Sequence, residues 1–138
     1  MREFSSKPEV TKLEIVLDGK PVYVRSLMAG DKVRLADMQG ELAALASKVK
    51  AQAANDDNES IGEAAQSVLS KDQYKAWVAY MYEEVFLRLC DGNGKRRFDS
   101  SKEGRKAFDA LPSDFVEAVY SETHAVLADD EEDAEKNS

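Results

Sequence analysis

The sequence contains one cysteine, one histidine and three prolines among its 138 residues. A lone Cys90 cannot form an intramolecular disulfide, and Cys90 with His124 cannot supply the ligands of a zinc site. Cys90 follows an apolar run, so we interpret it as a small buried hydrophobic residue, with a reactive thiol as the alternative. No window approaches the ~20 apolar residues of a membrane span, and the N-terminus lacks the apolar core of a signal peptide. We therefore expect a soluble, cytosolic protein without a metal or other cofactor.

Positive charge is scarce as well. The sequence has 19 Lys and Arg residues and 27 Asp and Glu residues, which gives a net charge of −8. Residues 129–138 hold six of the carboxylates and one lysine, so they contribute −5 of this charge. Phosphate backbones and anionic membranes attract Lys and Arg, and the charge therefore argues against nucleic-acid and membrane partners. The acidic segment cannot bury apolar surface, so we expect residues 129–138 to form a disordered tail.

What the sequence does contain suits one mainly helical domain. A hydrophobic content of 43% is enough for a single core in a chain of this length. The sequence predicts an α+β fold over residues 12–128, in which an N-terminal β-hairpin packs on about four helices. The expected helical segments are residues 30–53, 61–69, 70–90, 101–111 and 113–128. Capping-box pairs open two of these segments, Ser70 with Gln73 and Ser100 with Glu103.

Alternating apolar residues predict the hairpin over residues 12–25, after a flexible segment at residues 1–11. Its turn is Asp18–Gly19, a pair typical of type I′ turns. A two-residue turn fixes the register, and the predicted pairs on the apolar face are Leu13 with Val24 and Ile15 with Val22. Pro21 has no N–H to donate, so its strand should lie at a sheet edge or leave that position unpaired.

Residues 30–53 carry apolar side chains at steps of three and four, which is typical of one helix face. This stripe consists of Leu35, Met38, Leu42, Leu45 and Val49. We interpret it as facing the core; the alternative is a surface that meets another subunit or a client. Gly40 weakens the helix by ~1 kcal/mol relative to Ala. The polar stretch 55–60 is interpreted as a loop, with a domain boundary as the alternative.

The segment 70–90 carries Trp77 and is apolar around most of its circumference. Such a helix is either the central helix of the fold or one whose second face is covered by a partner. We favour the central helix. In the alternative, Tyr80 and Phe86 would belong to the partner-facing surface.

The segment from Asp91 to Gly94 begins like a calcium-binding loop. The spacing then fails, because EF-hand positions 5, 6 and 12 would be Lys95, Arg96 and Lys102. We interpret the segment as a helix C-cap followed by a turn that needs a positive φ at Gly92 or Gly94.

No residue set in the sequence specifies a reaction. His124 has no carboxylate one helical turn away to orient it as a base, so we interpret it as a surface or boundary residue. The sequence also lacks a nucleophile elbow and a glycine-rich phosphate motif. Its basic concentration comprises Lys95, Arg96, Arg97, Lys102, Arg105 and Lys106. We interpret this cluster as a solvated surface; the alternative is that it receives an acidic partner segment or this chain's own tail.

A hairpin, a tryptophan-bearing helix, the run from Leu89 to Phe98 and an amphipathic C-terminal helix together resemble the tail assembly chaperones of long-tailed, siphophage-type bacteriophages. The structural signature consists of Trp77, Cys90, Asp91, Gly92, Gly94 and Phe98. The resemblance covers residues 12–128. It implies a non-catalytic protein of the infected bacterial cytoplasm that is absent from the mature virion. Such a protein binds the tape measure protein and promotes assembly of the tail tube.

The resemblance also implies a contact with the major tail tube protein through a longer product of ribosomal frameshifting. The residues Glu135–Asn137 are compatible with a slippery heptamer if their codons are GAA, AAA and AAC. A homo-oligomer is left open. The candidate protein-interaction residues, in the alternatives in which these surfaces meet a partner, are Leu35, Met38, Leu42, Leu45, Val49, Tyr80, Phe86, Arg96 and Arg97. The alternatives are an acidic protein-binding module or nucleic-acid mimic that inhibits a host factor, and a small enzyme.

Overall fold

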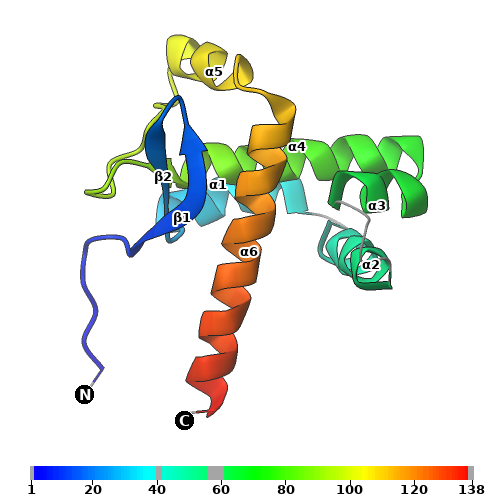
Figure 1. Ribbon diagram of the computed structural model, residues 1–138, viewed down its shortest axis with the longest axis horizontal. Helices are drawn as coiled ribbons and strands as arrows, with labels where there is room; N and C mark the ends of the chain where they lie inside the picture. Colours follow the sequence, from blue (N-terminus) through cyan, green and yellow to red (C-terminus); the bar gives the residue numbers. More distant parts are fainter. Residues whose placement is uncertain (1, 40–41, 56–60, 137–138) are drawn as a thin grey trace. The chain divides into compact units, whose positions relative to one another are not determined.

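The computed structural model describes residues 2–39, 42–55 and 61–136 (Figure 1). Over these ranges the fold is α+β and mainly helical, with six helices and one three-stranded antiparallel sheet, which confirms the predicted class. The strands are β1 (Val10–Leu17), β2 (Lys20–Arg25) and β3 (Leu89–Cys90). The helices are α1 (Ala29–Gln39), α2 (Leu42–Asn55), α3 (Ile61–Val68), α4 (Lys71–Arg88), α5 (Lys102–Asp109) and α6 (Ser113–Lys136).

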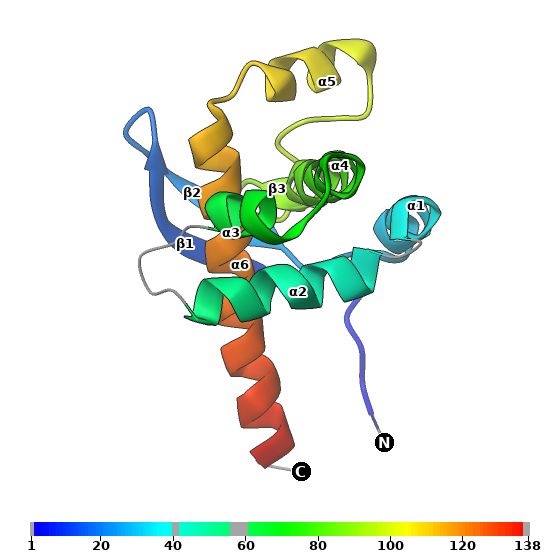
Figure 2. The ribbon, with the colours of Figure 1, turned by 90° about the vertical axis from the view of Figure 1, so that its right-hand side faces the viewer.

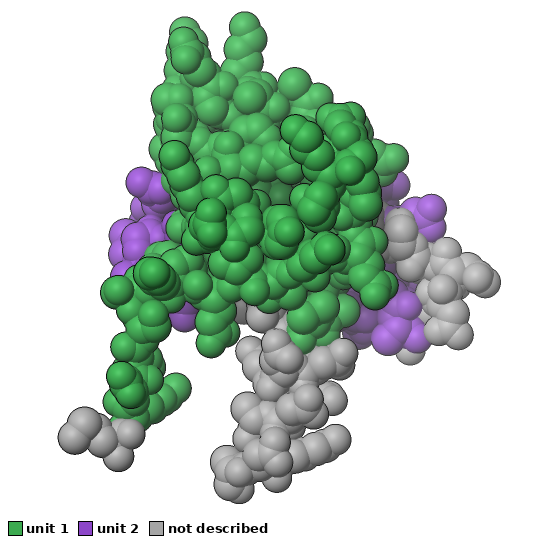
Figure 3. Space-filling view, turned by 60° about the vertical axis from the view of Figure 1, so that its left-hand side comes forward, with its two compact units in different colours: residues 1–28, 85–138 green, residues 29–84 purple. Residues whose placement is uncertain are grey.

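The chain divides into two compact units (Figure 3). Unit 1 comprises residues 1–28 and 85–138 and therefore holds the sheet, α5 and α6. Unit 2 comprises residues 29–84 and holds α1 to α3 with most of α4. Unit 1 is thus built from both ends of the sequence, and unit 2 is inserted between them.

The β1–β2 hairpin turns at Asp18 and Gly19, as predicted. Both residues have a positive φ, 52° and 77°, which is the geometry of a type I′ turn. Leu17 pairs with Lys20 directly across this turn. The local dipeptide therefore determines where the chain reverses.

The register of the hairpin changes along its length, so one predicted pair is wrong. Val16 pairs with Pro21 as predicted for a two-residue turn, but farther out Val24 lies opposite Thr11, not Leu13. Between these points three residues of β1 lie opposite Val22, so β1 contains two extra residues. A shift of two keeps every side chain on its face. Leu13, Val22 and Val24 accordingly stay at most 4% exposed.

Pro21 does not place β2 at a sheet edge. The strand order is β1-β2-β3, which puts β2 in the middle. The β2–β3 ladder consists of Tyr23 with Cys90 and Val24 with Leu89, so it ends before Pro21. The missing N–H of proline is tolerated because β3 does not extend that far.

The helix expected over residues 70–90 is shorter at its C-terminal end. Its start is correct: Gln73 N–H donates to Ser70 Oγ at 3.2 Å, and Ser70 N–H donates to Gln73 Oε1 at 3.0 Å. Its end is wrong, because α4 stops at Arg88 and Leu89–Cys90 form β3. A fully buried apolar run suits a helix and a strand equally, and pairing with β2 decides for the strand.

The single helix expected over residues 30–53 is two helices, α1 and α2. Residues 40–41, which separate them in the sequence and include Gly40, lie outside the described residues. The predicted helix at residues 61–69 corresponds to α3. The polar stretch interpreted as a loop lies outside the described residues from position 56 to 60.

The last two helices also differ from their predicted ends. The N-cap of α5 is Ser101, whose Oγ accepts from Gly104 N–H at 3.0 Å, so the capping box expected at Ser100 is wrong. Asp99 lies two residues before Ser101, and its carboxylate accepts hydrogen bonds from the Ser101 hydroxyl and then from the Ser101 N–H, which lower the pKa of the carboxyl. The helix α6 continues to Lys136, beyond the predicted end near Ala128 and into the expected tail. Glu, Ala and Lys are good helix formers and do not require a buried face to extend a helix.

The predicted stripe faces the core. Leu35, Leu42, Leu45 and Val49 are at most 6% exposed, and Met38 is half-buried. Trp77 is 2% exposed, and every residue from Glu84 to Cys90 is buried, which agrees with a central position of α4 in the fold.

Candidate protein-binding groove

The segment after β3 forms a tight turn that bends back on the sheet. Asp91 N–H donates to the Lys95 carbonyl at 2.9 Å, and Gly94 N–H donates to the Asp91 carbonyl at 3.1 Å. A bridge between Cys90 and Arg96 closes the two sides. The turn therefore extends from a strand, and the predicted helix C-cap at this position is wrong.

Asp91 uses its carboxylate to stabilise the turn. Its Oδ1 accepts from the backbone N–H groups of Asn93 at 2.8 Å and Lys95 at 3.0 Å. This is the local capping role that short acidic side chains play in turns. Within the described residues, no three His, Cys, Asp or Glu side chains come together as a metal site. The residue types that make this segment resemble a calcium-binding loop are therefore explained by the turn that they form.

Gly94 is the glycine that requires a positive φ, and Gly92 is not. Its φ is 87°, and a Cβ added there would lie 3.0 Å from Pro8 Cγ and 3.2 Å from Val10 Cγ2. The turn therefore packs closely against the segment that leads into β1. The N-terminal segment expected to be flexible supplies this contact.

An aromatic cluster holds the other end of the turn. Phe108 of α5 meets Phe86 and Phe98 edge to face, with ring centroids 5.3 and 5.8 Å apart. The guanidinium carbons of Arg96 and Arg105 lie 4.8 and 4.1 Å from the Phe86 ring centroid, within cation–π range. Phe98 thus connects the turn to the aromatic cluster, and Arg96 is largely part of the packing.

An open hollow of about 510 Å³, here called the basic groove, lies between the turn and β2. Its lining residues are Lys20, Pro21, Tyr23, Cys90, Asp91, Gly92, Lys95, Arg96 and Arg97. Four of these residues are cationic and one is a carboxylate. Lys20, Lys95 and Arg97 are exposed, whereas Tyr23 and Arg96 are half-buried. The groove presents exposed cations around an aromatic side chain, which suits an acidic peptide.

A second hollow of about 680 Å³ runs along β1, lined by Lys12, Leu13, Glu14, Ile15, Val16, Gly19 and Pro21. It is open and has a mixed lining. Val16 is 64% exposed beside it. This surface has apolar character but no convergent set of charged groups, so it carries less information about a partner than the basic groove.

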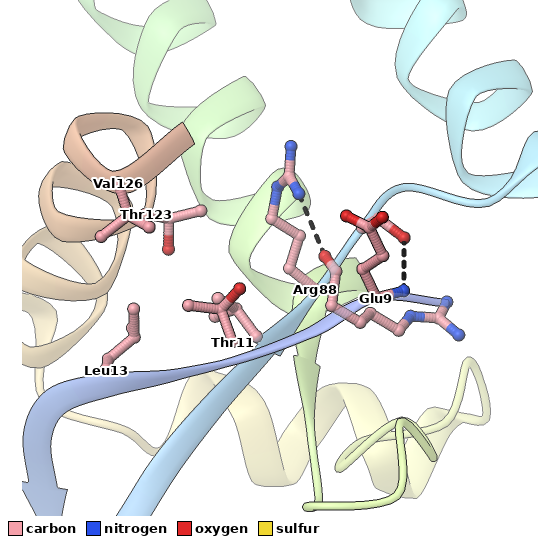
Figure 4. Close-up of a pocket in the computed structure, with 9 residues that line it drawn as sticks. Glu9, Thr11, Leu13, Arg88, Thr123 and Val126 are labelled. Carbon is pink, nitrogen blue, oxygen red and sulfur yellow. Dashed lines mark hydrogen bonds between the residues drawn. The ribbon is translucent and has the colours of Figure 1, made fainter. Parts of the chain in front are cut away.

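A third space is a small cavity of about 30 Å³ in unit 1 (Figure 4). Its polar lining is tied to the backbone: Arg88 Nη1 donates to the Arg25 carbonyl at 3.0 Å, and Glu9 N–H donates to Ser26 Oγ at 3.0 Å. Leu13, Thr123 and Val126 approach it from β1 and α6. A space of this size holds one or two water molecules, far below the ~300 Å³ of a small-molecule site.

Cys90 lies under the groove as a buried thiol. It is 3% exposed, and burial raises its pKa to about 11, against the opposing effect of the Arg25 charge. The negative charge of Asp91 raises the pKa further. At neutral pH the group is a protonated thiol, which agrees with a buried hydrophobic residue and not with a nucleophile.

His124 is a boundary residue, as predicted. It is half-buried on α6, and its ring centroid lies 4.4 Å from that of Tyr120. Its role in the structure is packing between neighbouring turns of one helix.

The structure brings only part of the predicted interface together. Arg96 and Arg97 line the basic groove, Tyr80 is half-buried, and Phe86 and most of the leucine stripe are buried. Sequence reasoning missed Lys20 and Tyr23. Tyr23 enters the groove because it pairs with Cys90, and this pairing was hidden when Leu89–Cys90 were assigned to a helix.

No protein-family model, curated protein or solved structure matches this chain. Among the helices in the described part of the chain, none has both the length and the apolar character needed to cross a membrane.

Proposed function

We propose that this protein is a non-catalytic tail assembly chaperone of a long-tailed bacteriophage, which binds the tape measure protein and promotes assembly of the tail tube. The proposal begins from the resemblance carried by the segment Trp77 to Phe98. The structural observation that supports it most is the basic groove, because the same segment supplies most of its lining. A turn that packs through Gly94 against Pro8 and Val10 and through Phe98 against Phe108 suits a surface that docks another protein.

Binding is favoured over catalysis by the character of the groups in the groove. Cys90, its one nucleophile candidate, is a buried thiol with a raised pKa. Asp91 already accepts two backbone hydrogen bonds through its Oδ1. The protonated thiol is a weak nucleophile, and the hydrogen bonds to Asp91 Oδ1 give that carboxylate a structural role in the turn.

The nucleic-acid mimic draws no support from the groove. A mimic of a phosphate backbone displays carboxylates over its folded surface, whereas this lining has four cations and one carboxylate. The proposed partners remain the tape measure protein and, through a frameshifted longer product, the tail tube protein. The proposed location is the cytoplasm of the infected host.

Co-expression with the neighbouring genes, among which the proposal expects one that encodes a large helical tape measure protein, tests the proposal. We expect that protein to be insoluble when expressed alone, and soluble and co-purifying when this chain is present. An unrelated acidic protein of similar size serves as the control for general solubility effects. If no tail component is solubilised or retained, the chaperone proposal is wrong.

The proposed ribosomal frameshift can be tested separately in the nucleotide sequence of the gene. A slippery run at codons 135–137 with an overlapping downstream frame is expected. Without either feature, the contact with the tube protein would need another explanation, and the binding of the tape measure protein would stand by itself.

A further inference from the structure

The basic groove lies beside a part of β2 that has no neighbouring strand on one side. The pair of the β2–β3 ladder that lies nearest the hairpin turn is Tyr23 with Cys90, whereas β2 begins at Lys20. Among the described residues, no strand therefore pairs with Lys20–Val22 on the β3 side. Lys20 and Pro21 line the groove at this point. The groove thus gives access to the edge of a strand.

The Pro21 carbonyl points toward this open side of β2. Successive residues of a strand direct their backbone groups to opposite neighbours. Lys20 pairs with Leu17 directly across the turn, and Ser26, just after β2, donates its N–H to the Glu9 carbonyl at 2.8 Å. The even-numbered residues of β2 are thus bonded toward β1. The odd-numbered Pro21 accordingly presents its C=O to the groove, and as a proline it has no N–H to present there.

The other edges of the sheet are already covered in part. Figures 1 and 2 both show α6 alongside β1, where Glu14 N–H donates to Glu122 Oε1 at 2.5 Å. Beyond β3, Arg97 N–H donates to the Leu89 carbonyl at 2.9 Å. In the part of the chain that the structure describes, the groove is therefore where the sheet can accept a further short strand.

The charge of the groove favours an acidic strand. Lys20, Lys95 and Arg97 are exposed around it, although the chain as a whole carries −8. The Asp91 carboxylate of the lining accepts hydrogen bonds from the N–H groups of Asn93 and Lys95 in its own turn. A segment that carries carboxylates is attracted by three exposed cations, and a segment that carries cations is repelled by them.

We propose that the basic groove binds a short, extended, acidic segment of the client, which adds to the open stretch of β2 and donates a backbone N–H to the Pro21 carbonyl. Three residues of β2 offer a length of ~10 Å at about 3.4 Å each, so the added strand is short and its carboxylates supply much of the attraction. The identity of the client rests on the proposed function, whereas the site and the chemistry of its ligand follow from the groove itself.

A fluorescent peptide of alternating Glu and Gly tests the site without any client. We expect fluorescence anisotropy to show binding to the full-length protein at about 0.01 M salt. Affinity should fall at least about tenfold by 0.1 M salt, as the Debye length shrinks from about 30 Å to about 10 Å. The same peptide with Gln in place of Glu is the neutral control and should bind weakly at both salt concentrations. A wild-type protein that does not bind the acidic peptide at low salt would overturn the proposal.

N-methylation of the peptide backbone tests strand addition. The methylated peptide keeps its carboxylates and loses its N–H donors, so it cannot donate to the Pro21 carbonyl. We expect binding on the order of tenfold weaker, the usual net value of one hydrogen bond. Equal affinities of the two peptides would mean that charge alone holds the ligand, and the proposed strand addition would be wrong.

Charge reversal locates the peptide in the groove. The groove variant is Lys20→Glu with Lys95→Glu and Arg97→Glu, and it should weaken binding on the order of 100-fold because repulsion replaces attraction. Circular dichroism checks that it is folded. If it is not, Lys20→Gln with Arg97→Gln is the milder variant and should still bind at least about tenfold more weakly than the wild type.

The matched control reverses three exposed lysines of unit 2, Lys32→Glu, Lys48→Glu and Lys75→Glu. It changes the net charge by the same amount as the groove variant and should bind the peptide within about threefold of the wild type. Equal losses in the two variants would show that the peptide responds to the overall charge, and the groove would not be its site.

Co-expression of these variants with the client separates this inference from the proposed function. We expect the groove variant to retain at least about tenfold less client than the wild type, and the control variant to retain a similar amount. Full retention by the groove variant would overturn the inference and leave the chaperone function standing. If the wild type retains no tail component yet binds the acidic peptide in the groove, the chaperone function is wrong and the acidic-peptide site stands.

Discussion

At the scale of single residues, Gly92 and Gly94 lie in the same turn but differ in whether the backbone there requires glycine. Gly94 combines a φ of 87° with a close approach to Pro8 and Val10. Gly92 has no positive φ, and a Cβ added there would meet Tyr23 Cζ at 3.7 Å, an ordinary contact. Only the first position requires glycine.

We predict that Gly94→Ala lowers the free energy of unfolding by about 1–2 kcal/mol, because a side chain in the left-handed region is strained and the neighbours must move. Gly92→Ala serves as the matched control and should change it by less than about 0.5 kcal/mol. Urea unfolding of both variants gives the comparison. Equal losses at the two positions would contradict the assignment.

Cys90 makes stability depend on pH in the alkaline range. Its pKa rises from 9.0 in the unfolded chain to about 11 in the folded one. A raised pKa means that the folded state keeps its proton longer, so the stabilisation is complete below pH 9 and is lost as pH rises toward 11. The total effect is at most about 3 kcal/mol.

Unfolding of the wild type and of Cys90→Ala at a series of pH values measures this dependence. The lysines titrate in both proteins, so the difference between the two curves isolates the thiol. We expect the stability of the wild type to fall more steeply between the two pKa values. Parallel curves would show that the thiol titrates alike in both states.

At the scale of elements, α5 packs on the rest of unit 1 through one buried side chain, with Arg105 over the Phe86 ring beside it. Phe108 is the buried residue of this helix and meets both Phe86 and Phe98. The helix is only eight residues long, too short to be stable by itself in water. Its position therefore depends on the aromatic cluster.

We predict that Phe108→Ala lowers the free energy of unfolding by about 3–5 kcal/mol, the usual loss for a buried phenylalanine. Phe4→Ala is the matched control, because Phe4 is 75% exposed, and it should change stability by less than about 0.5 kcal/mol. Thermal unfolding of both proteins measures the difference. A small effect at Phe108 would mean that α5 is held by other contacts.

Elements whose signals are local could be predicted from the sequence, and elements that depend on distant partners could not. The Ser70–Gln73 capping box and the Asp18–Gly19 turn each lie within a few residues and were predicted correctly. The strand β3 was missed because Leu89 and Cys90 become a strand only beside β2, more than sixty positions earlier. The hairpin register failed for a similar reason, since alternation fixes a face and not a partner.

At the scale of the whole molecule, the full set of residues that line the basic groove could not have been predicted from the sequence. Arg96 and Arg97 were recognised as part of a basic cluster, but Lys20 and Tyr23 join them only through the β2–β3 pairing. The net charge, by contrast, follows from composition alone. A local positive surface on an acidic protein gives a selective site for acidic segments.

We predict that the protein does not bind duplex DNA at about 0.1 M salt, in spite of its basic groove. The net charge of −8 repels a polyanion, and the four groove cations would replace few counterions. An electrophoretic mobility assay with a basic DNA-binding protein as positive control checks this. A retarded band with the wild type would restore nucleic acid as a partner class.

The two extra residues of β1 have a consequence for how the hairpin tolerates insertions and deletions. Removing two residues from the stretch opposite Val22 would realign the ladder and leave the same side chains inside. Removing one residue would move every side chain in the outer half of the strand to the opposite face of the sheet and would bring Lys12 toward the core. Homologous chains are therefore expected to differ in length here by even numbers, a parity that the sheet itself imposes.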